Sequence, residues 1–547
     1  MKPFIPGSVY KFLFALLGLV YLTGLTVPLM DNDSAHHANI ALHMHLTGDY
    51  ASLIDHNGDY LDKPHLLFWL SAFCYKIFGV TGFAYKFPSF LFTILGVYST
   101  YRLGKSLYNK EVGKLAALIL ASSFAFILAN NDVRMDAMLT ACIALATWQL
   151  AEFIQHKKLL NVAGATLGLA LGFSTKGMIA VFVPAIGAVF YILYRKDWKI
   201  FFNWKWLPML LLFAVFISPV LYCYYLQYDL HPEKVVRGKD HISGIKFILL
   251  NQSVERFGGE TGDISKQDYF FFLHSFLWAF APWSILAYIA IAGRIKNFLK
   301  RKEEWLTAGT FLVMLILVSL SGFKLPHYLN IIFPAASVMT AVFIINSQSR
   351  GKFTRSIFSI QLVVSVLLLV AVAVINALAF PVKNIWIIIM LVLLLAHVFY
   401  FIKSKMIPPL QKAVLIPVAT MILCFFLLNT NFYQQLLKYQ GGNQLASKTG
   451  GKVDLNNVYF WKETQSSSFV FYTKTLRKQF DDSVLIDGKK IWLLYDIKDE
   501  TEIKVKYKIG ERFETLDYEI TKIDIKFVNP EKREKQCSKM VLGEIFR

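Results

Sequence analysis

The chain has 547 residues, of which 55% are hydrophobic and 17% are charged, and its mean hydropathy is +0.46. This composition leaves too little polar surface to cover soluble domains of that total size, so it excludes an ordinary soluble enzyme and favours an integral membrane protein. The net charge of +20 does not indicate nucleic-acid binding, because the basic residues form short clusters between apolar runs and no basic groove interleaved with aromatics.

Thirteen apolar runs approach the length of roughly 20 residues that a helix needs to cross a bilayer. The first, at 10–30, belongs to an N-terminal segment that carries Lys2 and Lys11 and has no small-residue cleavage site, so we expect a retained span and not a signal peptide. The others lie at 84–104, 114–130, 136–155, 159–175, 178–194, 206–226, 270–292, 306–322, 328–347, 356–379, 384–402 and 412–429.

Basic clusters fall in alternate connections between these spans, for example Lys157/Lys158, Arg350/Lys352 and Lys403/Lys405. Cytoplasmic loops carry an excess of lysine and arginine, so the pattern predicts a cytoplasmic N-terminus. It places a first outer loop (31–83), a second outer loop (227–269) and the tail outside. The segment 64–79 is apolar, but it is short and contains Lys76, and counting it as a span would reverse the pattern. We therefore expect an interfacial amphipathic helix there.

The tail after residue 430 has a different pattern. Its β-like runs and one possible helix, at 466–472, predict a small α/β domain; the runs are 458–461, 483–486, 491–497 and 502–509. The predicted architecture is thus an all-α polytopic membrane bundle over residues 1–429, followed by a soluble α/β domain over 430–547.

The first outer loop is rich in acidic and histidine side chains. Carboxylates at a membrane surface can act as general bases for a hydroxyl or amine acceptor, and His/Asp clusters can hold a divalent metal. For any single residue a solvated loop position is the commoner explanation. Asp33 has a stronger case, since it follows the first span directly and lies four residues before His37, on the same face of a helix. The loop's other residues of this kind include Asp31, Asp55, Asp62, His36, His56 and His65.

Cationic side chains on the outer side are candidate phosphate ligands. Lys63 follows Asp62 just before the interfacial helix, where a cation meets lipid phosphates, although a snorkelling lysine explains it equally well. Arg256 in the second outer loop can pair with a phosphate through its fork geometry, or be an ordinary loop arginine. Further ionisable residues at outer span ends either face the bundle interior or simply mark the span end; they are Asp132, Arg134, Asp136, Lys176 and Lys324.

Short motifs exclude several reaction classes. There is no P-loop, no GxGxxG entering a helix, no HExxH and no GxSxG, so nucleotide-driven, dinucleotide and standard hydrolytic chemistry lack support. The five cysteines have neither metal-type spacing nor a disulfide pattern. The residues alone therefore indicate an outward-facing polar site over a membrane bundle, suited to a phosphorylated lipid.

Eight motifs follow one another over about the first 340 residues. They are DNDSAHHANIALHMHLTGDY (31–50), DHNGDYLDKPHLLFWL (55–70), FGVTGFAYKFPSFL (78–91), RMDAML (134–139), FSTKGMIAVFVP (173–184), ERF (255–257), FAPWSIL (280–286) and GFKLPHYLNIIFPA (322–335). Together, in this order, they resemble the membrane glycosyltransferases of the protein O-mannosyltransferase superfamily, which have the GT-C fold. The sequence looks most like the bacterial branch that includes the 4-amino-4-deoxy-L-arabinose lipid A transferases.

The resemblance implies inverting transfer of a sugar from a polyprenyl-phosphate donor to a lipid, glycan or protein acceptor, at the periplasmic face of a bacterial inner membrane. It gives Asp33 the position of the residue that activates the acceptor, and Lys63 that of a donor-phosphate contact. Asp62 and Asp136 match further acidic site residues. The remaining donor-phosphate candidates are Arg256, Lys176, Lys324, His327 and Tyr328. Neither the sugar, the acceptor nor an oligomeric state follows from the resemblance.

The sequence departs from the family pattern in its first outer loop. Ser34 stands where Glu is common, His37 where an aromatic is usual, and DKPP has become DKPH with His65. The second outer loop lacks the histidine with which the lipid A branch can hold a metal, so His36, His37 and His65 are the candidate ligands if a divalent metal is used. A lipid-linked sugar transporter or flippase and an inactive membrane scaffold are the alternative functions.

Overall fold

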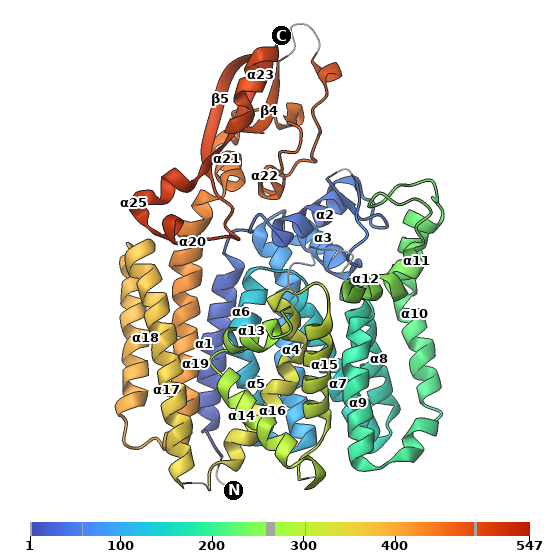
Figure 1. The fold of residues 1–547 in the computed structure, drawn as a ribbon, viewed down its shortest axis with the longest axis vertical. Helices are drawn as coiled ribbons and strands as arrows, with labels where there is room; N and C mark the ends of the chain where they lie inside the picture. The colour runs from blue at the N-terminus through green and yellow to red at the C-terminus, as the bar shows by residue number, and fades with distance from the viewer. Residues whose placement is uncertain (1–2, 57, 259–267, 301, 350, 486–489) are drawn as a thin grey trace.

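The computed structural model describes residues 3–56, 58–258, 268–300, 302–349, 351–485 and 490–547, and its account of side chains further excludes 256–258, 299 and 352. Long helices run side by side, and a small domain with a β-sheet stands on one end of this bundle (Figure 1). The N-terminus lies at the opposite end. The predicted fold class, a helical membrane bundle with a small C-terminal α/β domain, is confirmed.

Each of the thirteen predicted spans contains a helix. The bundle consists of α1 (Gly7–Leu25), α4 (Gly82–Leu107), α5 (Lys110–Ala121), α6 (Phe124–Asn131), α7 (Asp136–His156), α8 (Leu159–Lys176), α9 (Ile179–Arg195), α10 (Trp206–Tyr224), α13 (Phe271–Ala279), α14 (Ser284–Lys296), α15 (Leu306–Leu320), η5 (Pro326–Ile332), α16 (Phe333–Asn346), α17 (Gly351–Val374), α18 (Ile385–Lys403) and α19 (Pro409–Leu427). Among the described residues, seven helical segments are long and apolar enough to cross a membrane, or eight if α5 and α6, which meet at 55°, form one span. The chain is thus a multi-pass membrane protein, and the count of thirteen stays a prediction.

Helix α7 lies at the centre of the bundle. Its most apolar stretch is 89% buried, whereas that of α18 is 6% buried and leaves a face for lipid. Small residues let the neighbouring backbones approach α7 closely: a Cβ at Gly96 of α4 would lie 3.1 Å from the Ala141 Cα, and one at Gly168 of α8 would lie 2.7 Å from the Ala146 nitrogen. This close packing fixes the first residue of α7, Asp136, at the end of the bundle that faces the C-terminal domain.

The first outer loop forms a cover over that end (Figure 1). It contains α2 (Asp33–Thr47), a short antiparallel hairpin of β1 (Ile54–Asp55) and β2 (Gly58–Asp59), and α3 (Leu66–Phe78), the helix predicted at the interface. Asn32 caps α2 by accepting from the Ser34 N–H, and Gly48 ends it with φ 76°. The second outer loop adds α11 (Gly244–Lys246), a π-turn at Phe247–Asn251 and α12 (Gln252–Gly258) beside this cover.

The C-terminal domain contains a four-stranded mixed sheet in the order β3–β4–β6–β5, in which only β3 and β4 are parallel. Its strands are β3 (Val458–Phe460), β4 (Ile491–Asp496), β5 (Lys508–Asp517) and β6 (Ser538–Phe546), and its helices are α20 (Tyr433–Leu436), α21 (Gly441–Thr449), α22 (Ser467–Thr473), α23 (Glu500–Lys506), α24 (Ile525–Val528) and α25 (Pro530–Arg533). The predicted strands β3 and β4 and the helix α22 are confirmed.

Two of the predicted strands in the tail are wrong in part. Residues 482–484 form a 3-10 turn in place of a strand, and residue 486 lies outside the described residues. Residues 502–506 belong to α23, and β5 begins only at Lys508. The alternating sequence there suits a strand, but Lys504 pairs with Glu500 at 2.6 Å, an i, i+4 contact that favours the helix. Strand β6 was not predicted.

The C-terminal domain docks on the start of α2 through a partly buried carboxylate. Asp31 accepts hydrogen bonds from the hydroxyls of Ser466 (2.9 Å) and Ser468 (2.7 Å) and from the Ser468 N–H (3.1 Å). The Asn39 amide donates to the Ser467 carbonyl at 2.8 Å. These contacts hold α22 against α2, so the domain is fixed directly above Asp33.

Asp517, in β5 at the same junction, makes the domain's stability depend on pH. Burial raises the pKa of its carboxyl from 3.8 to about 6. The folded state then binds more protons than the unfolded state between those values, so the free energy of unfolding falls as pH rises from about 4 to about 6, by up to roughly 3 kcal/mol. We expect Asp517→Asn to flatten this part of the profile, measured as Tm between pH 4 and 7. Glu511→Gln, on an exposed side chain of β5, is the control; an unchanged slope in Asp517→Asn would contradict the assignment.

Candidate active site

Asp33 is an exposed carboxylate at the first turn of α2, below the C-terminal domain. Its side chain is 55% exposed and pairs with Arg134 Nη1 at 3.5 Å. Arg134 Nε in turn donates to Asp132 Oδ2 at 2.7 Å. The guanidinium is thus held by one largely buried carboxylate while it orients a second that remains open to an incoming group.

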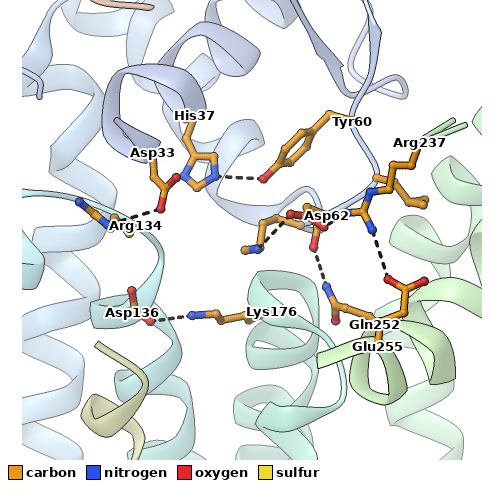
Figure 2. A network of polar contacts seen from close by, with 12 residues as sticks. Asp33, His37, Tyr60, Asp62, Arg134, Asp136, Lys176, Arg237, Gln252 and Glu255 are labelled. Atoms are coloured by element: carbon orange, nitrogen blue, oxygen red, sulfur yellow. Dashed lines mark hydrogen bonds and ion pairs between the residues drawn. The ribbon is translucent and has the colours of Figure 1, made fainter. Parts of the chain in front are cut away.

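A second, buried ion pair lies next to the first (Figure 2). Lys176 Nζ, at the end of α8, donates to Asp136 Oδ1 at 2.7 Å, and both side chains are less than 10% exposed. His327 Nε2 lies 4.0 Å from the other oxygen of Asp136, and the ammonium group of Lys176 lies 5.2 Å from the centre of the Tyr328 ring. Four of the predicted residues are therefore together in one cluster.

Met135 lies in the chain between Arg134 and Asp136, which belong to the two ion pairs. It has φ 74°, in the left-handed region, and is fully buried. Such a conformation costs a non-glycine residue about 1–3 kcal/mol and persists where the surroundings enforce it. Figure 2 shows the result, with Arg134 beside Asp33 and Asp136 beside Lys176.

A cavity of about 90 Å³ lies at the Asp136–Lys176 pair. Its lining combines these charged groups with a largely apolar wall that includes Leu139, Ile179, Val318, Phe323, Tyr328 and Ile331. An ammonium group next to apolar side chains suits a ligand that has both an anionic head and a hydrocarbon chain.

The loop around Asp62 ties the two outer loops together. Arg237 from the second outer loop pairs with Asp62, and also with Glu255 of α12 at 3.2 Å. The Gln252 amide donates to the Asp62 carbonyl at 2.6 Å, and Lys63 Nζ lies 3.8 Å from Asp62 Oδ2 (Figure 2). Asp62 is therefore fixed by cations, and Gln252, which donates to its backbone carbonyl, also lines the apolar cavity.

A larger polar cavity, of about 500 Å³, lies between the first outer loop and the C-terminal domain. Asp33 lines it, together with carboxylates and imidazoles from both parts of the chain: Asp31, His36, Asp55, His56, Asp517 and Glu519. A polar ligand entering this cavity would thus meet Asp33, with the buried Asp136–Lys176 pair beyond it.

The three histidines proposed as metal ligands have different surroundings. His37 is buried, with Nε2 3.1 Å from the Tyr60 hydroxyl, and burial lowers its pKa well below the usual range. His65 is also buried, with Nε2 2.9 Å from the Ala51 carbonyl oxygen, and burial lowers its pKa to about 4. Only His36 faces the polar cavity, where its Nδ1 lies 3.4 Å from Asp55.

Of the two remaining candidates, Lys324 has a described side chain and Arg256 has not. Lys324 lies over the ring of Tyr269, 5.7 Å from its centre. The side chain of Arg256 lies outside the described residues. Sequence reasoning named Arg134 and His56 without giving either a specific role, and it did not name Arg237 or Gln252. The alternation of charges at 132, 134 and 136 was a usable signal for Arg134, whereas Arg237 is placed only by the folding of the second outer loop.

Comparison with known proteins shows which families and relatives this chain is similar to. Residues 62–223 match the family described as dolichyl-phosphate-mannose-protein mannosyltransferase. The undecaprenyl phosphate-alpha-4-amino-4-deoxy-L-arabinose arabinosyl transferase 2 of Proteus mirabilis is 27% identical over 333 residues, which are 59% of this chain and 56% of that protein. An uncharacterized protein of Aquifex aeolicus is 26% identical over 62% of this chain and 65% of its own length. The matched part of the chain thus spans less than two thirds of these curated relatives.

Solved structures extend the likeness to the whole chain. ArnT from Cupriavidus metallidurans, bound to undecaprenyl phosphate, superposes with a TM-score of 0.73 at 13% identity and covers 98% of both chains. The oligosaccharyltransferase of Archaeoglobus fulgidus gives 0.54 at 12% identity, over 90% of this chain and 70% of that one. The resemblance drawn from the sequence is confirmed for the fold: the chain has the GT-C fold of ArnT.

Proposed function

We propose that this chain is an inverting glycosyltransferase, which moves a sugar from a polyprenyl-phosphate donor to a lipid, glycan or protein acceptor. The observation that carries the proposal is the position of Asp33, an open carboxylate on the polar cavity, beside the buried Lys176 on the apolar one. The relatives support it, because one is named for an undecaprenyl-phosphate-linked sugar and ArnT was crystallised with undecaprenyl phosphate.

The donor enters from the apolar side in this proposal. Isoprene units contact the cavity wall formed by α7, α9, α15 and η5, and the phosphate meets the ammonium groups of Lys176 and Lys63. A cation stabilises the charge of a leaving phosphate more strongly in a site from which water is excluded. Lys176, whose side chain is 8% exposed, is in such a site.

The acceptor enters through the polar cavity. Asp33 removes the proton from its hydroxyl or amine while that oxygen or nitrogen attacks the anomeric carbon. The bond between the anomeric carbon and the phosphate oxygen breaks, and polyprenyl phosphate leaves with the electron pair. Arg134 holds Asp33 in place through the 3.5 Å ion pair. Attack from the face opposite the phosphate gives inversion.

The geometry suits Asp136 to a positioning role. At 2.7 Å from Lys176 and 3% exposed, its carboxylate fixes the ammonium group and is shielded from an acceptor. Asp62, paired with Arg237, positions Lys63 in the same manner. Asp33 is then the one residue of the three predicted carboxylates that is free to take a proton.

Mass spectrometry of lipids, glycans and glycoproteins from cells with and without this protein tests the function. The proposal expects one glycoconjugate to lose a sugar and the corresponding polyprenyl-phosphate sugar to accumulate. Unchanged glycoconjugates would contradict it, and movement of lipid-linked sugar across vesicles without bond formation would support the transporter in its place.

We further propose that the protein lies in a bacterial inner membrane with its N-terminus in the cytoplasm and its C-terminal domain in the periplasm. The basic clusters support this orientation, as does the placement of the N-terminus and the C-terminal domain at opposite ends of the bundle. A reporter enzyme active only in the periplasm should work when fused after Arg547. Activity of a cytoplasm-dependent fluorescent fusion at the same position would contradict the orientation.

A further inference from the structure

Two histidines and one aspartate converge in the polar cavity. His36 Nδ1 lies 3.4 Å from Asp55 Oδ2, and His56 Nε2 lies 3.6 Å from Asp55 Oδ1. One ligand atom from each of the three residues lies within 4.8 Å of the others. For a tetrahedral zinc ion with bonds of about 2.0–2.1 Å, neighbouring ligand atoms lie about 3.3 Å apart. Each imidazole nitrogen is therefore near the bound separation from one of the two oxygens of Asp55.

Three separate features of the backbone bring these groups together. His36 is on the first turn of α2, three residues after Asp33. Asp55 is the last residue of strand β1. His56 follows in the hairpin turn with φ 47°, in the left-handed region that is uncommon for residues other than glycine, although histidine adopts it more often than most. This conformation costs free energy and is typical of positions where a side chain must be aimed.

The surroundings favour a cation. Asp55 Oδ1 is buried and has no hydrogen-bond donor among the described residues. Three further carboxylates, of Asp31, Asp517 and Glu519, line the same cavity. Buried carboxylate oxygens without donors are costly, and a metal ion removes that cost.

We propose that His36, Asp55 and His56 bind a zinc ion at the acceptor side of the cavity. Two imidazole nitrogens and one carboxylate oxygen are a ligand set that zinc accepts, and three protein ligands leave a fourth position open. The three residues line the same cavity as Asp33. An ion held by them would supply a position for an oxygen or nitrogen atom of the acceptor; this role rests on the proposed function, whereas the metal binding does not.

Zinc titration of the purified full-length protein tests the site. After removal of metal with a chelator, isothermal titration calorimetry is expected to show one tight site per chain. Both His56→Ala and the isosteric Asp55→Asn should weaken it at least tenfold. His231→Ala, an exposed histidine of the second outer loop, is the matched control and should bind zinc as the wild type does.

Cobalt provides a second readout that does not depend on activity. Co²⁺ bound by these residues should give the intense visible absorption of a four-coordinate ion, and this absorption should be lost in Asp55→Asn. Equal zinc affinity in the wild type and both variants would overturn the proposal, as would a wild type that binds no zinc. The metal site and the proposed function can fail separately. If the wild type binds zinc and the variants do not, but the wild type transfers no sugar, the metal site is upheld and the proposed function is refuted.

Discussion

Asp33→Asn is expected to lower the rate of sugar transfer by about 10²–10⁴-fold, the usual contribution of a general base. The amide has nearly the same shape as the carboxylate but cannot take a proton. Because Asp33 is 55% exposed, its replacement should leave the fold intact. The measurement is the initial rate of transfer by purified protein in lipid vesicles, together with Tm.

The matched control is Asp240→Asn. Asp240 is an exposed carboxylate, 69% accessible, in the second outer loop, and its nearest charged partner is His241. Its variant should transfer sugar at the wild-type rate. A wild-type rate in Asp33→Asn would remove Asp33 from the catalytic role, and an equal loss in both variants would show that the effect is not specific to Asp33.

Lys176→Met is expected to reduce both stability and donor binding. It leaves the buried carboxylate of Asp136 without its ion-pair partner, which typically costs about 3–5 kcal/mol. It also removes a cation from the donor phosphate. A charge-assisted contact is worth about 1.5–3 kcal/mol, so the Kd for polyprenyl phosphate should rise roughly 10–100-fold. Thermal unfolding measures the first effect, and lipid binding measures the second.

The double variant Asp136→Asn/Lys176→Met separates these two effects. With no uncompensated charge left in the bundle, most of the lost stability should return. Donor binding and transfer should stay low, because the cation is still missing. Wild-type transfer by the stable double variant would show that the pair is structural only, and a double variant as unstable as Lys176→Met would contradict the ion-pair argument.

The bundle was predictable because its signals are local and redundant. Apolar runs such as 136–155 and 412–429 match helices α7 and α19 closely, and the short helix with Lys76 was excluded from the spans by loop charge. The central position of α7 was not predictable. It depends on close approaches at Gly96 of α4 and Gly168 of α8, which follow from how three helices pack together and not from the local sequence of α7.

The candidate site was predictable in its residue types but not in its pairings. The sequence indicated Asp33, Asp136 and Lys176 as members of one outer site. It did not show that Lys176 reaches Asp136, 40 residues away, or that Arg134 orients Asp33. Such contacts follow from tertiary packing, and for Arg134 also from the left-handed backbone at Met135, which no local preference predicts.

The C-terminal domain shows where local sequence pattern predicts the wrong secondary structure. The stretch 502–509 alternates polar and apolar residues as a strand does, yet its first half is helical, because charge pairs such as Glu500–Lys504 favour α23. The docking of α22 on α2 through Asp31 was equally hidden from the sequence. That contact closes the polar cavity over Asp33 and links the C-terminal domain to the site.

Reconstituted transfer tests the central claim most directly. Purified protein in lipid vesicles is supplied with an isotope-labelled polyprenyl-phosphate sugar and an extract of the acceptors from cells that lack the protein. The account predicts labelled sugar on an acceptor, with one molecule of polyprenyl phosphate released for each sugar transferred, and loss of both products in Asp33→Asn. Release of polyprenyl phosphate without sugar transfer, or no reaction with any acceptor fraction, would contradict it.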